Sequence, residues 1–446
     1  MFSTSMKNFM WKWQRLRAMR IREVAYRTQR YLGSEIEALC LRSGWSPRPG
    51  GEVKPKLTLF GGVPEWRELW HKQYSLEAKR LDELVDGYVY FFGYPKLHVG
   101  TPVDWHKDPL TGTRAPIMFH SRLDYRDPAR VGNVKVIWEL GRHQHLVSLA
   151  VAYAVSGEHT YKTAVVEQIE SWITTNPYGT GIHWCSALEV ALRLISWATV
   201  HSLLSLRDGE NGLFAAVGDR RQLGVALYQQ AYFVRHNLSR HSSANNHLIG
   251  ELTGLFLACL VFDLGTDGQR WALAARVELE REAVAQVHPD GVNKEQSSYY
   301  HLWVLEYLFV AWLAGSRAGF EFSQCFHDRI VAMARFLRDL RPEGGIPPQI
   351  GDADDGAVLR FDATTGGDPY AAVLAAADAM SGRREGHSWL EGVPQKAFWY
   401  GLIRSGSTES PKTAQVGETE APCYPHVYQD GGYAVLRGGN THLVFD

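Results

Sequence analysis

The sequence predicts a mainly α-helical protein: a closed or curved toroid of antiparallel helix pairs, with a short β segment at the C-terminal end. Three observations lead to this prediction. From Val136 onward, apolar residues recur at the spacing of a helical face. Turn sequences such as Asn176-Pro-Tyr-Gly and His288-Pro-Asp-Gly separate the periodic segments, which suits antiparallel pairs. No fixed-period repeat is visible, which argues against a regular solenoid.

The composition narrows the class of protein. The chain has 446 residues, 45% of them hydrophobic and 21% charged, with a net charge of −1. This is ordinary for a folded protein and argues against a disordered chain, a collagen-like repeat or a coiled coil. The balanced charge argues against general nucleic-acid binding, which normally requires a basic excess. The 15 Trp, 20 Tyr and 18 Phe residues suit sugar-binding surfaces, but a large core consumes aromatic residues as well.

Metal and cofactor signatures are missing from the sequence. The five Cys residues are widely spaced and form no CxxC pair, which argues against a disulfide framework and a thiolate zinc site. No HExxH motif, phosphate-binding loop or nucleophile elbow occurs. We therefore predict no metal and no cofactor in this chain. The Asp-rich loop Gly351-Asp-Ala-Asp-Asp-Gly356 could bind calcium, although solvated or capping Asp residues are commoner in such loops.

The N-terminal segment is strongly basic. Met1 to Arg30 holds eight Lys and Arg residues against the single Glu23, and it has no apolar signal-peptide core. Interleaved apolar residues predict an amphipathic helix. Such a helix could lie on an anionic membrane, but we favour a helix that packs on the body with solvated Arg residues. The apolar stretches 254–262 and 302–315 are too short to cross a bilayer. On sequence alone we expect no integral membrane span and a cytoplasmic location.

The chain divides into three expected regions. Residues 1–135 hold the basic helix and an irregular segment rich in Trp, Pro and Gly, 136–400 form the toroid, and 401–446 hold a linker and the β segment. Helices are expected over 143–156, 160–174, 186–205, 218–236, 246–263, 269–287, 298–315, 326–340 and 369–380. Strand-like runs at 431–437 and 441–445, separated by Gly438-Gly-Asn440, predict a hairpin.

Polar residues gather in the connections between the predicted helices, where a rigid scaffold usually displays functional groups. The first cluster is Trp138-Glu-Leu-Gly-Arg-His-Gln-His145. Arg142, His143 and His145 could hold an anion near a positive helix end. They could equally cap the helix and bond between helices. His143 and His145 do not share a helical face, which argues against a metal pair.

The second cluster contains Trp184, Glu189 and Arg193. Glu189 and Arg193 are four residues apart and can pair along a helix. Trp184, at the mouth of a helix, could stack on a sugar ring or belong to the core.

The third cluster leads into the helix expected near residue 245. Ser242 and Ser243 are plausible N-cap residues. They would place Asn246 and His247 in the first turn, at its positive end, where an amide and an imidazole suit a carboxylate ligand. Adjacent Asn residues are also an ordinary capping sequence.

The fourth cluster, Glu295-Gln-Ser-Ser-Tyr-Tyr-His301, opens another helix. Tyr300 could transfer protons if a cationic site stabilised its phenolate. The alternative is a pair of Tyr side chains packed at a helix end.

Together these motifs make the sequence similar to the heparinase II/III family of polysaccharide lyases and to relatives that act on alginate. The resemblance covers about 136–446, and more weakly Pro102-Val-Asp-Trp-His-Lys-Asp-Pro109. It rests on the order and spacing of Trp138 to His145, Trp184 to Arg193, Ser242 to Glu251, Glu295 to His301, Gly351 to Gly356 and Gly432 to Arg437.

The resemblance implies a fold and a reaction. Family members have an incomplete (α/α) toroid followed by an antiparallel β-sandwich, and they break a glycosidic bond beside a uronic acid by β-elimination. Carried over to this sequence, Asn246 would hold the substrate carboxylate with His247 beside it. Tyr300 would act as the acid and could also act as the base, and its separation from Asn246 matches such lyases. We expect substrate contacts from Arg142, His143, His145, Trp184, Glu189, Glu295, Gln296, His301 and Asp352.

One departure from the family bears on these expectations. The family usually supplies a further His, and often a structural zinc, from a β-sandwich beyond the point that corresponds to Asp446. The resemblance thus implies an anionic polysaccharide or oligosaccharide as partner, a periplasmic or secreted location, and zinc only in that sandwich.

Two other functions stay open. The first is a glycoside hydrolase on the same toroid, with two carboxylates among Glu189, Glu251, Glu295 and the Asp352 loop. The second is a glycan-binding protein without catalytic activity.

Overall fold

A computed structural model describes residues 19–60, 78–342, 345–354, 356–363, 368–380, 395–405, 425–438 and 441–446. The main helices of the body are α6 (Val134–Gly141), α7 (Gln144–Ser156), α8 (His159–Thr175), α9 (Ala187–Asp208), α11 (Arg220–His236), α12 (Asn246–Val261), α13 (Gly265–Gln286), α14 (Ser298–Arg317), α15 (Gln324–Leu340), α16 (Pro369–Met380) and α17 (Gln395–Ser405). Shorter helices are α4 (Ala78–Val85), α5 (Pro128–Val131) and α10 (Gly212–Ala216). Every helix expected from the periodicity is present, with ends shifted by a few residues at most.

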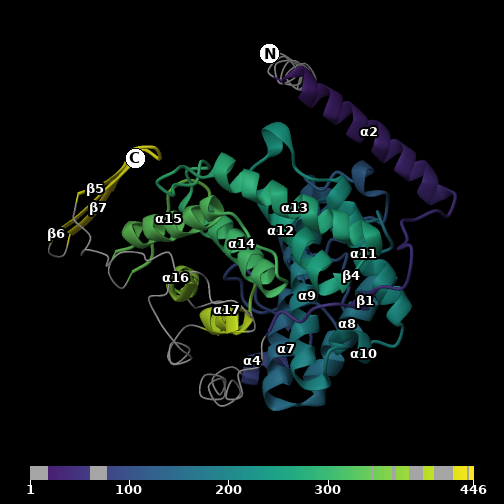
Figure 1. The fold of residues 1–446 in the computed structure, drawn as a ribbon. Coiled ribbons are helices and arrows are strands. Elements are labelled where there is room, and N and C mark those ends of the chain that lie inside the picture. Colours follow the sequence, from purple (N-terminus) through teal and green to yellow (C-terminus); the bar gives the residue numbers. More distant parts are fainter. Residues whose placement is uncertain are drawn as a thin grey trace.

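Two helices form the centre of the body, as Figure 1 shows. The helix α9 is buried from Ala187 to Leu204, and α12 is buried from Leu248 to Val261. Apolar residues occupy all sides of both helices, so each needs neighbours all round. Close contact is possible because Gly254 has no side chain: a Cβ atom there would lie 2.4 Å from the carbonyl oxygen of Ala191. The neighbours α7, α13 and α14 complete the core around this pair.

One described helix, α9, is long and apolar enough to cross a membrane by length and composition alone. However, 94% of its apolar window is buried inside the protein. A central core helix has the same length and composition, so this property is explained by packing.

The C-terminal residues form a small antiparallel sheet in the order β5 (His426–Tyr428), β6 (Tyr433–Gly438) and β7 (Thr441–Phe445). The sheet has one strand more than the predicted hairpin. It packs on α15, where Tyr428, Tyr433 and Val435 share a small apolar cluster with Phe336. Two pairs of two-residue strands lie outside this sheet among the described residues and are too short to organise the body. They are β1 (Lys54–Pro55) with β4 (Phe262–Asp263), and β2 (Tyr88–Val89) with β3 (Leu97–His98).

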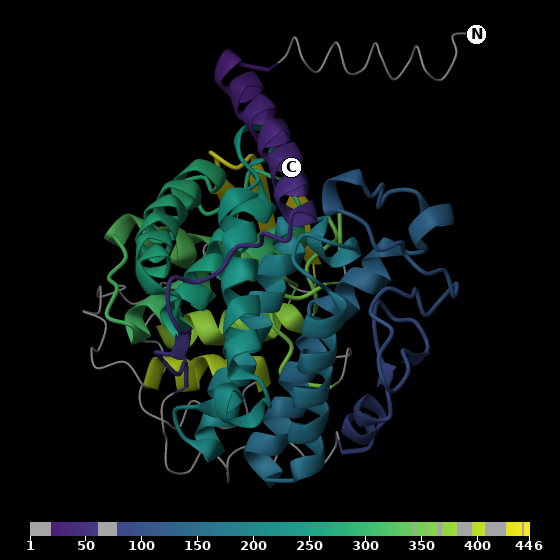
Figure 2. The same cartoon turned by 90° about the vertical axis from the view of Figure 1, so that its right-hand side faces the viewer.

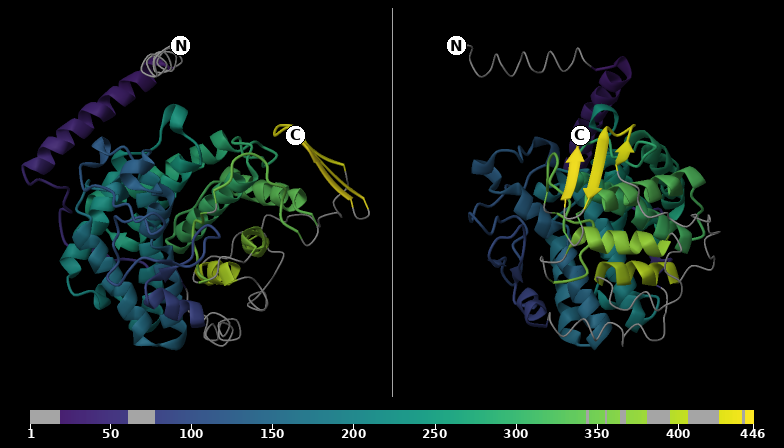
Figure 3. Two further views of the ribbon diagram at one scale, coloured as in Figure 1. Left: turned by 180° about the vertical axis from the view of Figure 1, so that it is seen from behind. Right: turned by 90° about the vertical axis from the view of Figure 1, so that its left-hand side faces the viewer.

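The helix α2 (Ile21–Arg42) stands on the outside of the body, on the side opposite to the small sheet (Figures 2 and 3). It does contact the body, as the favoured prediction requires, through the apolar residues Ala38 and Leu41 near its end and through polar groups. The Tyr26 hydroxyl donates to the carbonyl of Leu238 at 2.8 Å, and Arg27 donates to the hydroxyl of Ser242 at 3.0 Å. Other apolar side chains of this helix face solvent, among them Leu32 and Ile36. The remainder of the predicted basic segment, residues 1–18, lies outside the described residues.

Candidate active site

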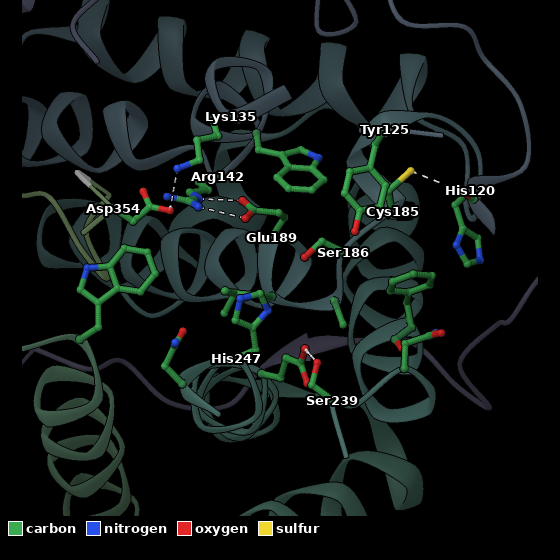
Figure 4. Close-up of a pocket in the computed structure, with 18 of the residues that line it drawn as sticks. His120, Tyr125, Lys135, Arg142, Cys185, Ser186, Glu189, Ser239, His247 and Asp354 are labelled. Carbon is green, nitrogen blue, oxygen red and sulfur yellow. Dashed lines mark hydrogen bonds and ion pairs between the residues drawn. The ribbon is translucent and has the colours of Figure 1, made fainter. Parts of the chain in front are cut away.

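The helix starts and connections that carried the sequence motifs meet around one cavity of about 370 Å³. This volume lies in the range of small-molecule and oligosaccharide sites. Figure 4 shows Asp354 and Lys135 at one side of the cavity, His120 and Cys185 at the other, and His247 between them. The lining includes Arg30, Tyr125, Lys135, Trp138, Arg142, Glu189, Phe233, Ser239, Asn246, His247, Glu251, Tyr300, Trp303 and Asp354.

Asn246 is the first residue of α12 and is held rigidly. Its backbone N–H and its Nδ2 donate to the two carboxylate oxygens of Glu295, each at 2.7 Å. Burial raises the pKa of Glu295, and the two hydrogen bonds from Asn246 oppose this shift. Glu295 itself does not line the cavity. It therefore acts on the site by fixing the amide of Asn246, which is 2% exposed.

The cap of α12 differs from the sequence prediction. Ser242 and Ser243 were expected to cap the helix, but they lie in a separate short turn, η3 (His241–Ser243). Asn245 is the N-cap, and its side chain accepts the N–H of His247 at 3.1 Å. An Asn side chain one residue before the helix reaches this donor directly, so the Ser residues are free to contact α2 instead.

His247 is open to the cavity, and its ring has no hydrogen-bond partner among the described residues. Neighbouring atoms displace part of the water around the imidazole, and this desolvation lowers the pKa of His247 below its usual value. Arg142 adds to this shift, while Glu189 and Asp354 oppose it. The imidazole is therefore neutral at neutral pH and can accept a proton.

Tyr300 lies in the first turn of α14, where the Ser297 side chain accepts its backbone N–H at 3.1 Å. In the described part of the chain its hydroxyl contacts no donor or acceptor. Burial raises the pKa of Tyr300, and the carboxylates of Asp354, Asp352 and Glu295 raise it further. The sequence suggested a cation that would stabilise the phenolate, and the surroundings described here do the reverse. The phenol stays protonated and is suited to donate a proton.

Arg142 is buried and its charge is already balanced. Its Nε and Nη2 donate to the carboxylate of Glu189 at 2.7 and 2.9 Å, and its Nη1 donates to Glu139 at 2.6 Å. Burial alone disfavours the cation, but attraction to Glu189 and Glu139 outweighs that cost and raises the pKa of Arg142. The predicted pair of Glu189 with Arg193 is wrong, because Arg193 donates to the side chain of Gln230 instead.

Four residues predicted to contact substrate are buried elsewhere. His143 accepts a hydrogen bond from Trp197 at 2.8 Å, His145 donates to Gln168 at 2.8 Å, and His301 donates to the carbonyl of Met333 at 3.0 Å. Trp184 is 1% exposed and packs among other aromatic rings. None of the four lines the cavity. The prediction that these four residues contact substrate is therefore wrong. Their side chains point into the core because neighbouring helices pack against that side of each helix start.

The remaining predicted contacts lie at the edge of the site. The Gln296 side chain is exposed and donates to the carbonyl of Gly431 at 3.2 Å. The backbone carbonyl of Asp352 accepts the Ser297 hydroxyl at 2.6 Å. Neither residue lines the cavity. Both instead join the start of α14 to neighbouring loops.

Several residues of the lining were not among those predicted from the sequence. Trp303 lies three residues after Tyr300 on α14, so helical spacing could have suggested it. Lys135 sits in the first turn of α6 and lies 3.7 Å from Asp354 in an ion pair. Arg30 gave no signal at all, because it reaches the cavity from a helix about 200 residues away in the chain.

The carboxylates of the cavity are occupied by other groups. Glu189 pairs with Arg142, and Glu251 accepts hydrogen bonds from the N–H and hydroxyl of Ser239 at 2.6 and 2.7 Å. Burial raises the pKa of Glu251 to about 7, and Ser239 opposes the shift. In the residues that the structure describes, no three His, Cys, Asp or Glu side chains are arranged to hold a metal ion.

A family model described as heparinase II/III N-terminus matches residues 75–362. The match spans more than half of the chain and includes Asn246, His247 and Tyr300. The chain belongs to the heparinase II/III family. This confirms the family that the motifs indicated.

Two curated relatives are heparin-sulfate lyases. The one from Pedobacter heparinus is 24% identical over 226 residues, which cover 49% of this chain and 33% of that protein. The one from Bacteroides stercoris is 24% identical over 292 residues, covering 59% of this chain and 39% of that protein. The chain thus spans well under half the length of these relatives.

Solved structures extend the likeness to most of the chain. Heparan sulfate lyase HepC from Pedobacter heparinus aligns with a TM-score of 0.51 and 18% identity, over 83% of this chain and 50% of that one. A heparinase III structure aligns with a TM-score of 0.50 and 15% identity, over 94% and 57%. At these identities the likeness concerns the fold, and it confirms the predicted helical toroid.

Proposed function

We propose that this chain carries the toroid part of a polysaccharide lyase that cleaves beside a uronic acid by β-elimination. One observation carries the proposal: Asn246 and His247, at the start of α12, line the same cavity as Tyr300, at the start of α14. Their chemical states suit the reaction, since they offer an amide donor, a neutral imidazole and a protonated phenol. The heparin-sulfate lyases among the relatives favour an anionic glycosaminoglycan as the substrate class.

The reaction requires three tasks. The uronate carboxylate has to be neutralised so that its C5 proton becomes acidic, and the Asn246 amide, fixed by Glu295, supplies a donor for the developing charge. A base then removes the C5 proton, and the electron pair forms the C4–C5 double bond. The C4–O bond breaks, and an acid protonates the departing oxygen.

Two of these tasks suit residues of the cavity lining, and the pKa directions of His247 and Tyr300 support this division. Tyr300 has a raised pKa, so it serves as the acid that protonates the leaving oxygen. His247 has a lowered pKa, so its neutral imidazole serves as the base. A single group that performed both tasks would need a pKa near the working pH, and the carboxylates around Tyr300 move its pKa away from that range.

The test is a screen of the purified protein against uronate polymers. A lyase creates an unsaturated uronate, which absorbs ultraviolet light, and releases no more reducing ends than double bonds. Reducing ends without this absorbance would instead indicate the hydrolase, and binding without products would indicate a glycan-binding protein. The engaged state of Glu189 and Glu251 makes the hydrolase outcome the less expected one.

A further inference from the structure

The helix α2 forms part of the wall of the cavity although it precedes the residues that match the family model. Its contribution is Arg30, which lines the cavity together with Asn237 and Ser239. The helix runs along the outside of the toroid (Figure 2).

Arg30 is held in place by neutral acceptors. Its Nη2 donates to the side-chain oxygen of Asn237 at 2.7 Å, and its Nη1 lies 3.5 Å from the carbonyl oxygen of Leu238. Tyr26, one helical turn earlier, donates to the same carbonyl at 2.8 Å. Residues four apart share a helical face, so both contacts fix the same side of α2 against the segment that leads into Ser239.

The charge of Arg30 is not balanced by an ion pair. The other two long cations of the lining have carboxylate partners, since Arg142 pairs with Glu189 and Lys135 with Asp354. Within the described ranges no carboxylate lies within ion-pair distance of Arg30. The Glu251 carboxyl is near enough for Arg30 to lower its pKa. It nevertheless keeps a raised pKa of about 7, so near neutral pH it compensates this cation only partly.

Arg30 lies toward one end of the cavity. Figure 4 shows Ser239 on the side of His247 that faces away from Asp354 and Lys135. Arg30 is anchored to the two residues that directly precede Ser239. The lining that Arg30 shares with Asn246 also contains aromatic side chains, including Phe233, and such rings can face sugar rings.

We propose that Arg30 forms a second anion subsite, which binds a carboxylate or sulfate group on a sugar unit next to the one that is cleaved. An arginine fork with free donors is well suited to such planar or tetrahedral oxyanions. The inference rests on the proposed function, because it assumes an acidic sugar chain in the cavity. It adds a specificity element from a helix that the family match does not include.

The test compares Arg30→Met with Arg30→Lys and with the control Arg22→Met. Arg22 lies on the same helix, is exposed and does not line the cavity. On a cleaved polymer, Arg30→Met should raise KM about tenfold or more with kcat within about twofold, because a charge-assisted contact made in the ground state is lost. Arg30→Lys should recover part of the loss, and Arg22→Met should behave as the parent protein. The salt dependence of KM should be weaker in Arg30→Met than in the parent.

Two substrate series identify the anion. A polymer that carries only carboxylates and a sulfated polymer with the same backbone are compared. A larger effect of Arg30→Met on the sulfated polymer assigns the subsite to sulfate, and an effect of equal size on both assigns it to carboxylate. Unchanged KM in Arg30→Met on both polymers, or equal losses in Arg30→Met and Arg22→Met, would overturn the subsite. A lowered melting temperature with a fall in kcat alone would also overturn it, since that pattern indicates a structural role.

A binding measurement separates this inference from the proposed function. If the parent protein makes no unsaturated product, its affinity for the same two polymers is measured by calorimetry. Binding that Arg30→Met weakens about tenfold supports the anion subsite even though the lyase assignment fails. Binding that is equal in both proteins, or absent from the parent, rejects the subsite.

Discussion

Two sets of polar residues at helix starts have opposite surroundings in this protein. Asn246, His247 and Tyr300 face a shared cavity, whereas His143 and His145, at the start of α7, are buried with partners in the core. Both sets consist of similar residue types in similar motifs. The difference lies in the neighbours. His145 bonds to Gln168 of α8 and His143 to Trp197 of α9, while Asn246, His247 and Tyr300 in the first turns of α12 and α14 border the cavity. Residue type therefore indicates which residues could form a site, and the packing of the helices decides which of them face the cavity.

The largest effect on turnover is expected for Tyr300, one of the residues that face the cavity. Tyr300→Phe removes only a hydroxyl that has no partner in the described structure. We expect turnover to fall by about a hundredfold or more with an unchanged melting temperature. The control is Tyr299→Phe, whose hydroxyl donates to the carbonyl of Gly356 and whose effect on turnover should be much smaller. Full turnover by Tyr300→Phe in an active protein would exclude the role as acid.

Substitutions of Asn246 and Glu295 distinguish a residue that contacts the substrate from a residue that only holds another side chain in position. Asn246→Ala should reduce turnover by about a hundredfold, since a donor aimed at the developing charge is lost. Glu295→Gln replaces one of two acceptor oxygens with a donor and leaves the Asn246 amide less fixed. We expect about a tenfold loss of kcat, with little change in the pH profile. A larger loss for Glu295→Gln than for Asn246→Ala would show that Glu295 itself contacts the substrate.

Substitution of a buried His that does not line the cavity should lower the free energy of unfolding and leave turnover nearly unchanged. His301→Ala removes the hydrogen bond to Met333 and leaves a cavity beside Phe336. A loss of about 2–4 kcal/mol in the free energy of unfolding is expected from denaturant titration. Turnover per folded molecule should stay within about twofold of the parent. A specific loss of turnover with unchanged stability would restore His301 to the site.

The smallest expected effect concerns pH. Burial lowers the pKa of His145 to about 4, below the value near 6.5 of the unfolded chain. The unfolded state then binds more protons between those two values, so this residue removes stability as the pH falls from about 6.5 to 4, by at most about 3 kcal/mol. The raised pKa of Glu251 acts in the opposite direction, so a difference measurement is needed.

The variant His145→Gln provides that difference, since its amide can still bond to Gln168. Its free energy of unfolding should fall less steeply than that of the parent between pH 6.5 and 4. Parallel curves for the two proteins would indicate that His145 is as well solvated in the folded state as in the unfolded chain.

The sequence alone determined the helices and the family. Periodic apolar residues and turn sequences predicted every main helix from α7 to α16, because a helix that buries apolar side chains must repeat them at its own spacing. The order of the motifs indicated the heparinase II/III family, and the motifs around Asn246 and Tyr300 named two groups that share the cavity.

Only the tertiary structure decided which polar residues face the cavity. Whether His143 or His247 is solvated depends on the helices that cover each ring, and those neighbours come from distant parts of the chain. The same holds for Arg142, which pairs with Glu189 across 47 residues, and for Arg30, which reaches the cavity from α2. Local patterns carry no information about such long-range contacts, because the contacts arise from the packing of whole helices.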